Sequence, residues 1–257
     1  MGSVKEGTSD ANALAAPLQN LLSAVNFGDF QVRCDVTTAR LFSKDFEEKH
    51  GFKPGWDVRV TVDRLVDEYL TRESKEPTSL GWIAHLTDLD GAYIPDANIT
   101  TDSTLEDRAY SLTGIVSPDA DVTRTEQAEK RRCIDMLVDQ KTSFQRNIKK
   151  TEDWRVPYRL FFMSRNLEHA LYGIINSLGS DDKEDHAARF ALNNSNQTVF
   201  KTKLDNMAQQ YGNSASWEES WQYARDRSTC HSLVAGSNLK WIEDFVASCK
   251  PTVLKVG

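Results

Sequence analysis

Apolar and polar residues follow each other along the chain with two different periods. Leucines three or four positions apart between residues 14 and 22, preceded by the polar Asp10, predict a helix over residues 10–25. A similar stripe predicts a second helix over residues 62–70. Residues 30–38 (FQVRCDVTT) alternate strictly, which is typical of a half-buried strand. The N-terminal region therefore predicts helices and strands in alternation.

Two short apolar runs without alternation predict buried strands. Residues 79–86 (SLGWIAHL) lead into Asp88 and Asp90, and residues 158–164 read YRLFFMS. A buried strand that ends in acids and glycine is typical of an α/β sheet, where functional sites lie beyond the carboxyl ends of the strands. The polar composition of residues 95–122 predicts a loop, and we expect helices at residues 125–150, 200–211, 217–225 and 239–246.

These elements together predict an α/β fold with a mainly parallel sheet flanked by helices. We expect a core over residues 1–175, with a loop and helix insertion around residues 95–150. The mostly helical residues 176–257 are expected to form a C-terminal extension packed on that core. The 257 residues, of which 39% are hydrophobic, suffice for a packed core, which excludes wholesale disorder.

The length of the apolar runs and the net charge exclude further classes of protein. No apolar run is long enough to span a bilayer, and residues 1–7 lack an apolar signal region, so we expect a cytoplasmic protein without membrane contact. The net charge of −7 argues against a sequence-independent nucleic-acid coat protein, which would carry a broad basic surface. The four cysteines show no CxxC spacing, and the single Cys230-His231 pair cannot build a zinc site.

Two acidic motifs are the strongest candidates for chemistry. Residues 6–10 (EGTSD) precede the first predicted helix, and residues 88–91 (DLDG) follow a predicted buried strand. Two carboxylates at i and i+2 just beyond a strand can face one crevice, and a third acid from a neighbouring strand end would complete an oxygen-rich site. Such a site suits Mg²⁺ or Mn²⁺, which prefer carboxylate and water ligands and can bind the oxygens of a phosphate.

The same residues carry a family resemblance. Residues 4–10 (VKEGTSD) resemble the first motif of Toprim domains, and residues 88–91 resemble the second, a strand ending in DxD. Residues 158–172 (YRLFFMSRNLEHALY) are similar to the later strand and helix of Toprim nucleases of the OLD and RloB-like bacterial defence proteins. The resemblance implies a Toprim-like core within residues 1–175.

Roles follow from this resemblance residue by residue. It implies that Asp88 and Asp90 are the principal ligands of Mg²⁺ or Mn²⁺, and that Glu6 acts in acid/base catalysis or as a further ligand. The supporting residues would be Gly7, Asp10 and Gly91, through helix capping and close backbone approach. Glu168 and His169 are open to two interpretations, an additional metal or acid/base pair and ordinary structural residues.

The implied activity is metal-dependent cleavage of DNA or RNA in anti-phage defence, of the abortive-infection kind. The chain has no GxxxxGK[ST] loop, so any ATP dependence would come from a separate ATPase subunit. One alternative is a Toprim-like module that has no activity of its own and acts with a partner. The chain could also form homo-oligomers. A phosphatase of the haloacid-dehalogenase type is another, because residues 88–92 also resemble its first motif, with Asp88 as nucleophile and Asp90 as acid/base.

Two other charged features have simpler interpretations. Asp119 and Asp121 form a second DxD, but they follow Ser117-Pro118, which favours a loop or a helix cap over a metal site. The basic residues between 124 and 150 favour a solvated helix face, with phosphate contact as the alternative.

Overall fold

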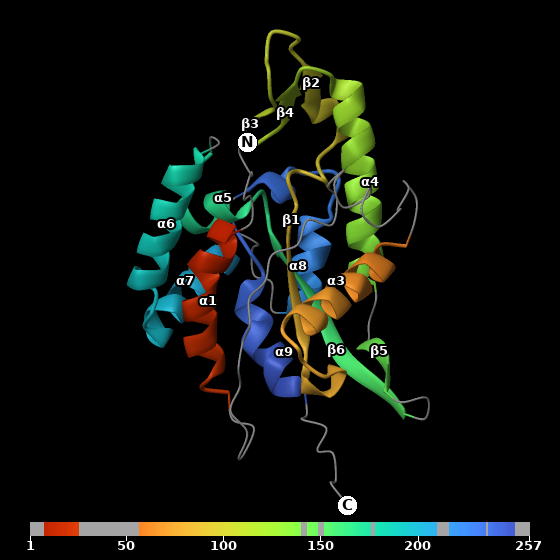
Figure 1. Ribbon diagram of the computed structural model, residues 1–257. Helices are drawn as coiled ribbons and strands as arrows, with labels where there is room; N and C mark the ends of the chain where they lie inside the picture. The colour runs from red at the N-terminus through yellow and green to blue at the C-terminus, as the bar shows by residue number, and fades with distance from the viewer. Residues whose placement is uncertain are drawn as a thin grey trace, which may run out of the picture.

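A three-strand sheet between two layers of helices forms the centre of the molecule (Figure 1). The computed structural model describes residues 8–25, 57–139, 143–148, 152–175, 178–209, 216–234 and 236–249. Strand β1 (Ile83–Asp88) pairs in parallel with β6 (Glu152–Met163), with Ile83 opposite Tyr158 and Asp88 opposite Met163. Strand β5 (Ser143–Ile148) pairs antiparallel with the first half of β6. The mixed α/β architecture predicted from the sequence is therefore present.

One face of the sheet is covered by helices from both ends of the chain. Because side chains alternate along a strand, Phe161 and Met163 of β6 point to this face. They pack in one apolar cluster with leucines 14, 18, 21 and 22 of the first helix. The helices on this face are α1 (Thr8–Leu22), α5 (Leu167–Tyr172), α6 (Ser180–Asn193), α7 (Gln197–Gln209) and α9 (Ile242–Ser248).

The opposite face is covered by α3 (Val58–Arg72), α4 (Ala120–Val138) and α8 (Trp217–Ala224). Here Leu160 and Phe162 of β6 pack with Trp221. The rings of Phe162 and Trp221 meet edge to face, with their centroids 4.7 Å apart. The indole nitrogens of Trp217 and Trp221 donate to the carbonyl oxygen of Leu160 at 2.8 and 3.3 Å. These bonds satisfy the two buried indole donors and fix α8 against the sheet.

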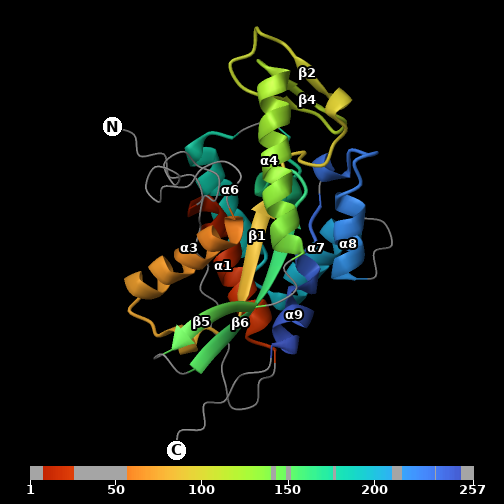
Figure 2. The same cartoon turned by 90° about the vertical axis from the view of Figure 1, so that its right-hand side faces the viewer.

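A second, smaller sheet lies beyond the carboxyl end of β1 (Figures 1 and 2). It consists of β2 (Ile99–Thr101), β4 (Ile115–Ser117) and β3 (Ala109–Tyr110), in that order. The prediction of a loop over residues 95–122 was therefore wrong in part. Strands of two or three residues are too short to show an alternating pattern, and their pairing depends on the apolar contact of Ile99 and Ile115 with Leu233.

The helix predicted over residues 125–150 is shorter and begins earlier. Asp119 caps α4 by accepting hydrogen bonds from the backbone nitrogens of Asp121 and Val122 at 2.9 and 3.1 Å, which confirms its capping role. The helix ends at Val138, where its buried apolar face ends, and residues 143–148 form β5. The antiparallel partner of β5 lies in β6, a long-range pairing that local periodicity does not reveal.

The remaining elements agree with the sequence to within a few residues. The predicted helices at 10–25 and 62–70 are α1 and α3, and those at 200–211 and 217–225 are α7 and α8. Residues 239–246 begin with the 3₁₀ turn η4 (Leu239–Trp241) and continue as α9; further 3₁₀ turns are η1 (Pro77–Ser79), η2 (Asp96–Asn98) and η3 (His231–Leu233). The strand predicted at residues 30–38 lies outside the described residues. Among those described, no helix is both long and apolar enough to cross a membrane.

The contact between His85 of β1 and Tyr158 of β6 leads us to expect that the stability of the protein depends on pH. The ring Nδ1 of His85 lies 2.7 Å from the hydroxyl of Tyr158, and burial lowers the pKa of His85 to about 4. The unfolded chain, with a histidine pKa of about 6.5, binds the proton more readily, so the free energy of unfolding falls as pH drops from about 6.5 toward 4. Between about pH 7 and pH 5 this histidine should lower the free energy of unfolding of the wild type by roughly 2 kcal/mol. His85→Leu should not show this part of the loss when urea unfolding is measured at the two pH values.

Tyr158→Phe is the matched control, because it removes the hydroxyl partner but keeps the buried histidine. Its stability should fall with pH about as steeply as in the wild type. Equal pH dependence in the wild type and in His85→Leu would show that other groups cause the loss.

Candidate functional site

The chain leaves β1 through a tight turn that carries Asp88 and Asp90. Pairing with β6 continues past the strand, since the backbone nitrogens of Leu89 and Asp90 donate to the carbonyl oxygens of Met163 and Arg165, both at 2.9 Å. Asp90 and Gly91 both have positive φ values, 46° and 75°. A Cβ on Gly91 would lie 2.9 Å from Cδ2 of Leu233, so this position requires glycine both for its backbone and for its space.

Helix α4 holds this turn with three side chains on one face. Gln127 Nε2 donates to the carbonyl oxygen of Asp90 at 2.8 Å, and Arg131 Nη1 donates to that of Ala92 at 2.6 Å. Between them Lys130 Nζ forms an ion pair with Oδ2 of Asp90. Positions 127, 130 and 131 are neighbours on a helix surface, so one rigid element fixes both the backbone of the turn and its carboxylate.

Lys130 responds to both carboxylates of the DxD motif. Its side chain is 18% exposed, against 31% for that of Asp90. Burial disfavours the charged amine, but the charges of Asp90 and Asp88 and the hydrogen bond to Asp90 outweigh this and raise the pKa of Lys130. The lysine therefore stays charged at neutral pH and neutralises part of the charge on the two aspartates.

A second buried cation follows the neighbouring strand. Arg165 comes two residues after the end of β6 and is 4% exposed. Its guanidinium carbon lies 4.5 Å from the ring centre of Tyr110, and Nη2 donates to the carbonyl oxygen of Ile175. Burial lowers the pKa of Arg165, while the charges of Tyr110 and Asp90 oppose that change. Two oppositely charged groups thus extend from the carboxyl ends of two paired parallel strands.

Three of the residues with buried, unpartnered polar atoms, Gln127, Arg165 and His169, lie at or beside this turn. Within the described part of the chain, four residues carry such side-chain atoms: Thr61, Gln127, Arg165 and His169. Gln127 contacts the turn, and the pKa of His169 is lowered by burial and then by the charge of Arg165. Since buried polar groups are nearly always hydrogen-bonded, their concentration here indicates a place built for a polar ligand.

The structure brings some predicted site residues together and does not describe others. Asp88 is the last residue of β1 and Asp90 lies in the turn that follows, and a Cβ on Gly91 would lie 3.1 Å from Ile115 of the small sheet. Glu6 and Gly7 lie outside the described residues, and Asp10 belongs to the first turns of α1. In both views α1 begins near the end of the sheet toward which β1 runs (Figures 1 and 2).

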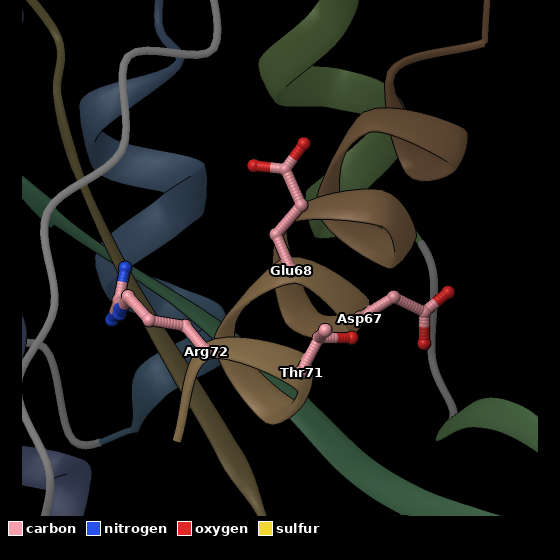
Figure 3. Close-up of a pocket in the computed structure, with 4 residues that line it drawn as sticks. All are labelled: Asp67, Glu68, Thr71 and Arg72. Carbon is pink, nitrogen blue, oxygen red and sulfur yellow. The ribbon is translucent and has the colours of Figure 1, made fainter. Parts of the chain in front are cut away.

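The acids of the other candidate pairs have structural partners. Glu168 forms an ion pair with Lys183 at 2.9 Å, and His169 is buried in the short helix α5. Asp121 pairs with Arg124 at 2.6 Å on the exposed start of α4. A hollow along α3 is lined by Asp67, Glu68, Thr71 and Arg72. Figure 3 shows that these four side chains spread in different directions, so they do not converge on a common ligand.

The donor chemistry of the turn fits a hard divalent cation. Mg²⁺ in proteins commonly takes one or two carboxylates and completes its coordination with water and substrate phosphate, and Asp88 and Asp90 supply that number. Among the residues described, no group of three or more His, Cys, Asp or Glu side chains could hold a metal ion by itself. A third protein ligand would have to come from elsewhere, and Glu6 remains the prediction for it.

Sequence reasoning placed Lys130 within a basic stretch expected on a solvated helix face and missed Arg165, although each leaves a signal. Lys130 interrupts the buried stripe of α4 formed by Gln127, Ile134 and Leu137, where an apolar residue is expected. Arg165 directly follows the apolar run 160–163 and Ser164, as the acids follow β1. A charged residue inside a buried stripe, or at the carboxyl end of a buried strand, is the feature that could have identified both.

The fold and the site define a class: a mixed α/β protein with two carboxylates and two cationic side chains, one partly and one fully buried, near the carboxyl ends of paired parallel strands. In comparisons with family models, curated proteins and solved structures, nothing matches this chain. The function is therefore argued from the site itself.

We expect that removing the charge of Lys130 lowers the stability of the protein and that a bound metal ion offsets part of this loss. Lys130→Met would remove the ion pair with Asp90 and the positive charge that acts on Asp88. Because the pair is only partly exposed, we expect a loss of about 1–3 kcal/mol in the free energy of unfolding. Millimolar Mg²⁺ should recover part of that loss in the variant, as measured by urea unfolding.

The control is Lys201→Met, which breaks a surface pair with Glu243 at 2.9 Å. It should cost less than about 1 kcal/mol and show no recovery with Mg²⁺. Equal losses in the two variants would mean that Lys130 does not balance the DxD carboxylates.

Proposed function

We propose that the protein is a metal-dependent nuclease that cleaves phosphodiester bonds of DNA or RNA at the site centred on Asp88 and Asp90. The observation that supports this most is the presence of two carboxylates together with the partly buried Lys130 and the buried Arg165 at one strand end. The carboxylates suit a divalent cation, and the basic groups suit the oxygens of a phosphate, so both halves of a metal–phosphate complex find partners.

Asp88 and Asp90 would hold Mg²⁺ or Mn²⁺, with Glu6 as the third ligand or the acid/base group that the Toprim resemblance implies. A bound divalent cation supplies charge neutralisation at the phosphate and makes a bound water more acidic. The chain's own part is positioning. Gln127 and Arg131 hold the backbone of the turn, and Lys130 fixes the carboxylate of Asp90. A turn held in advance needs no reorganisation during the reaction.

The Toprim resemblance extends this proposal to the cellular role. In that setting the protein would act in anti-phage defence in the cytoplasm, with nucleic acid as substrate and with a separate ATPase subunit as partner. If the chain serves only as a Toprim-like module of that partner, it would bind the ATPase and cleave nothing by itself.

One observation favours a second candidate, hydrolysis of a small phosphate monoester. Asp88 ends β1 and Asp90 lies two residues further on, with Lys130 from α4 acting on both. A carboxylate oxygen of Asp88 would form a bond to phosphorus while the ester oxygen leaves with a proton from Asp90. Water, giving a proton to Asp90, would then break the bond between phosphorus and Asp88 and release inorganic phosphate.

Metal binding can be tested without knowing the substrate. Neighbouring carboxylates repel each other and are stabilised by a cation that binds the folded state, so Mg²⁺ or Mn²⁺ should raise the melting temperature of the wild type. The double variant Asp88→Ala/Asp90→Ala should stay folded and lose this rise. A shift of equal size in both proteins would exclude the two aspartates as ligands.

Cleavage tests the nuclease proposal directly. Asp90→Asn keeps the size of the side chain and its tolerance of positive φ, but weakens the charge that would hold the metal. We expect a fall in cleavage rate of roughly 10²–10³, the typical cost of one such electrostatic contribution. Glu6→Gln should also reduce the rate severely and leave nucleic-acid affinity largely intact. The measurement is Mg²⁺-dependent cleavage of mixed DNA and RNA substrates.

Asp121→Asn, in the second DxD, is the matched control and should change neither rate nor affinity. Wild-type rates in both Glu6→Gln and Asp90→Asn would rule out the Toprim interpretation. Loss of activity in the Asp88 and Asp90 variants alone, on a small phosphate monoester, would favour the second candidate.

A further inference from the structure

We propose that Arg165 forms the anion half of the site, binding the phosphate of the substrate together with a cation on Asp88 and Asp90. This deepens the proposed function and rests on it for the identity of the anion. The argument itself starts from the surroundings of Arg165, which contain a buried positive charge and unused hydrogen-bond donors.

The first observation is that Arg165 lacks partners for two of its donors. The residue is 4% exposed, and within the described part of the chain neither Nε nor Nη1 has a hydrogen-bond acceptor. Its one hydrogen bond from the guanidinium goes to a neutral carbonyl, that of Ile175. A buried guanidinium normally carries a carboxylate or phosphate on these groups, because burial of unpaired donors is unfavourable.

The second observation is that the guanidinium is held in a fixed orientation beside the DxD turn. The Tyr110 ring covers its face at 4.5 Å, and the Ile175 carbonyl binds one end. The carbonyl oxygen of Arg165 accepts the backbone hydrogen of Asp90 at 2.9 Å, so the arginine and the acidic turn are fixed to each other. A planar, immobilised guanidinium with free N–H groups matches the geometry of a phosphate.

The ring of Tyr110 covers one face of the Arg165 guanidinium, and we place the entry of the anion there. Tyr110 lies on β3, which has two residues and pairs with β4 alone in the described sheet. Such a short edge strand has few hydrogen bonds to break, so movement of the ring away from the guanidinium is the route by which an anion would enter. Tyr110→Ala should therefore keep phosphate binding, since the donors belong to Arg165.

Charge makes the two halves of the site depend on each other. The carboxylate of Asp90 acts electrostatically on Arg165 and would repel an anion that approaches alone. A divalent cation on Asp88 and Asp90 removes this repulsion, and an anion on Arg165 in turn favours the cation. Phosphate should therefore bind more tightly in the presence of Mg²⁺, and Mg²⁺ more tightly in the presence of phosphate, by the same factor.

The test is calorimetric titration of the full chain with inorganic phosphate, with and without Mg²⁺. We expect Arg165→Met to weaken phosphate binding at least about tenfold, the effect of losing a charge-assisted contact, and to keep the Mg²⁺-dependent rise in melting temperature. Arg165→Lys should lie in between, because it keeps the charge and loses the planar donors. If Arg165→Met does not fold, Arg165→Lys decides by the same comparison.

Arg159→Met is the matched control. Arg159 lies on β6, the strand that precedes Arg165, and also packs over aromatic rings, 5.1 Å from Trp217 and 5.0 Å from Phe245, but within the sheet rather than beyond its carboxyl end. It should bind phosphate like the wild type. No phosphate binding by the wild type with Mg²⁺, or unchanged binding in both Arg165 variants, would overturn the proposal.

Cleavage assays separate this proposal from the proposed function. Phosphate binding that depends on Arg165, in a protein that cleaves no phosphate ester, would leave the anion site standing and remove the nuclease. If the wild type cleaves nucleic acid, and Arg165→Met has the same KM and the same inhibition by phosphate, the nuclease proposal would stand and the anion site at Arg165 would not. Oligonucleotides with and without a terminal phosphate, added as competitors, show whether the bound anion is a chain end or an internal phosphate.

Discussion

The ion pair between Lys130 and Asp90 joins the parts of the molecule on which the site depends. Helix α4 contacts three regions along its length. Its first residue, Ala120, packs in the small sheet, its middle holds the turn after β1, and Ile134 and Leu137 pack on the main sheet. The position of the acidic turn is therefore set by the helix and not by β1 alone. A change in the register of α4 by one residue would move Lys130 away from the carboxylate and expose Ile134.

The turn has features that a purely structural connection would not need. Asp90 adopts a left-handed conformation that is less favourable than in glycine by roughly 1–2 kcal/mol, although Asp tolerates it better than most residues. Unpartnered buried atoms of Gln127 and Arg165 lie next to it. Both features reduce stability and both occur at the carboxyl ends of parallel strands, where α/β proteins place their ligands. The strain and the unused donors together support a binding role.

Local pattern was enough to predict the elements whose chemistry is local. The strand that ends at Asp88 follows the mostly apolar run 79–86, and Asp119 lies two and three residues before the backbone N–H donors that it caps, so both could be predicted from neighbouring residues. The short strands β2 to β4 and the pairing of β5 depend on partners far along the chain, and they were missed. Lys130 and Arg165 were missed for the same reason, because their meaning depends on how α4 and β6 pack beside the turn.

The balance of charge at the site limits what can bind there. The two carboxylates and the two cationic side chains offset part of each other's charge, so an ion of either sign should bind less tightly alone than as half of a metal–phosphate pair. A free metal ion competes with Lys130 for Asp90, and a free anion approaches Arg165 against the field of the same carboxylate. A metal–phosphate pair meets neither obstacle, because its cation faces the aspartates while its oxygens face the basic groups. An acidic protein with a net charge of −7 can in this way act on a polyanion without a broad basic surface.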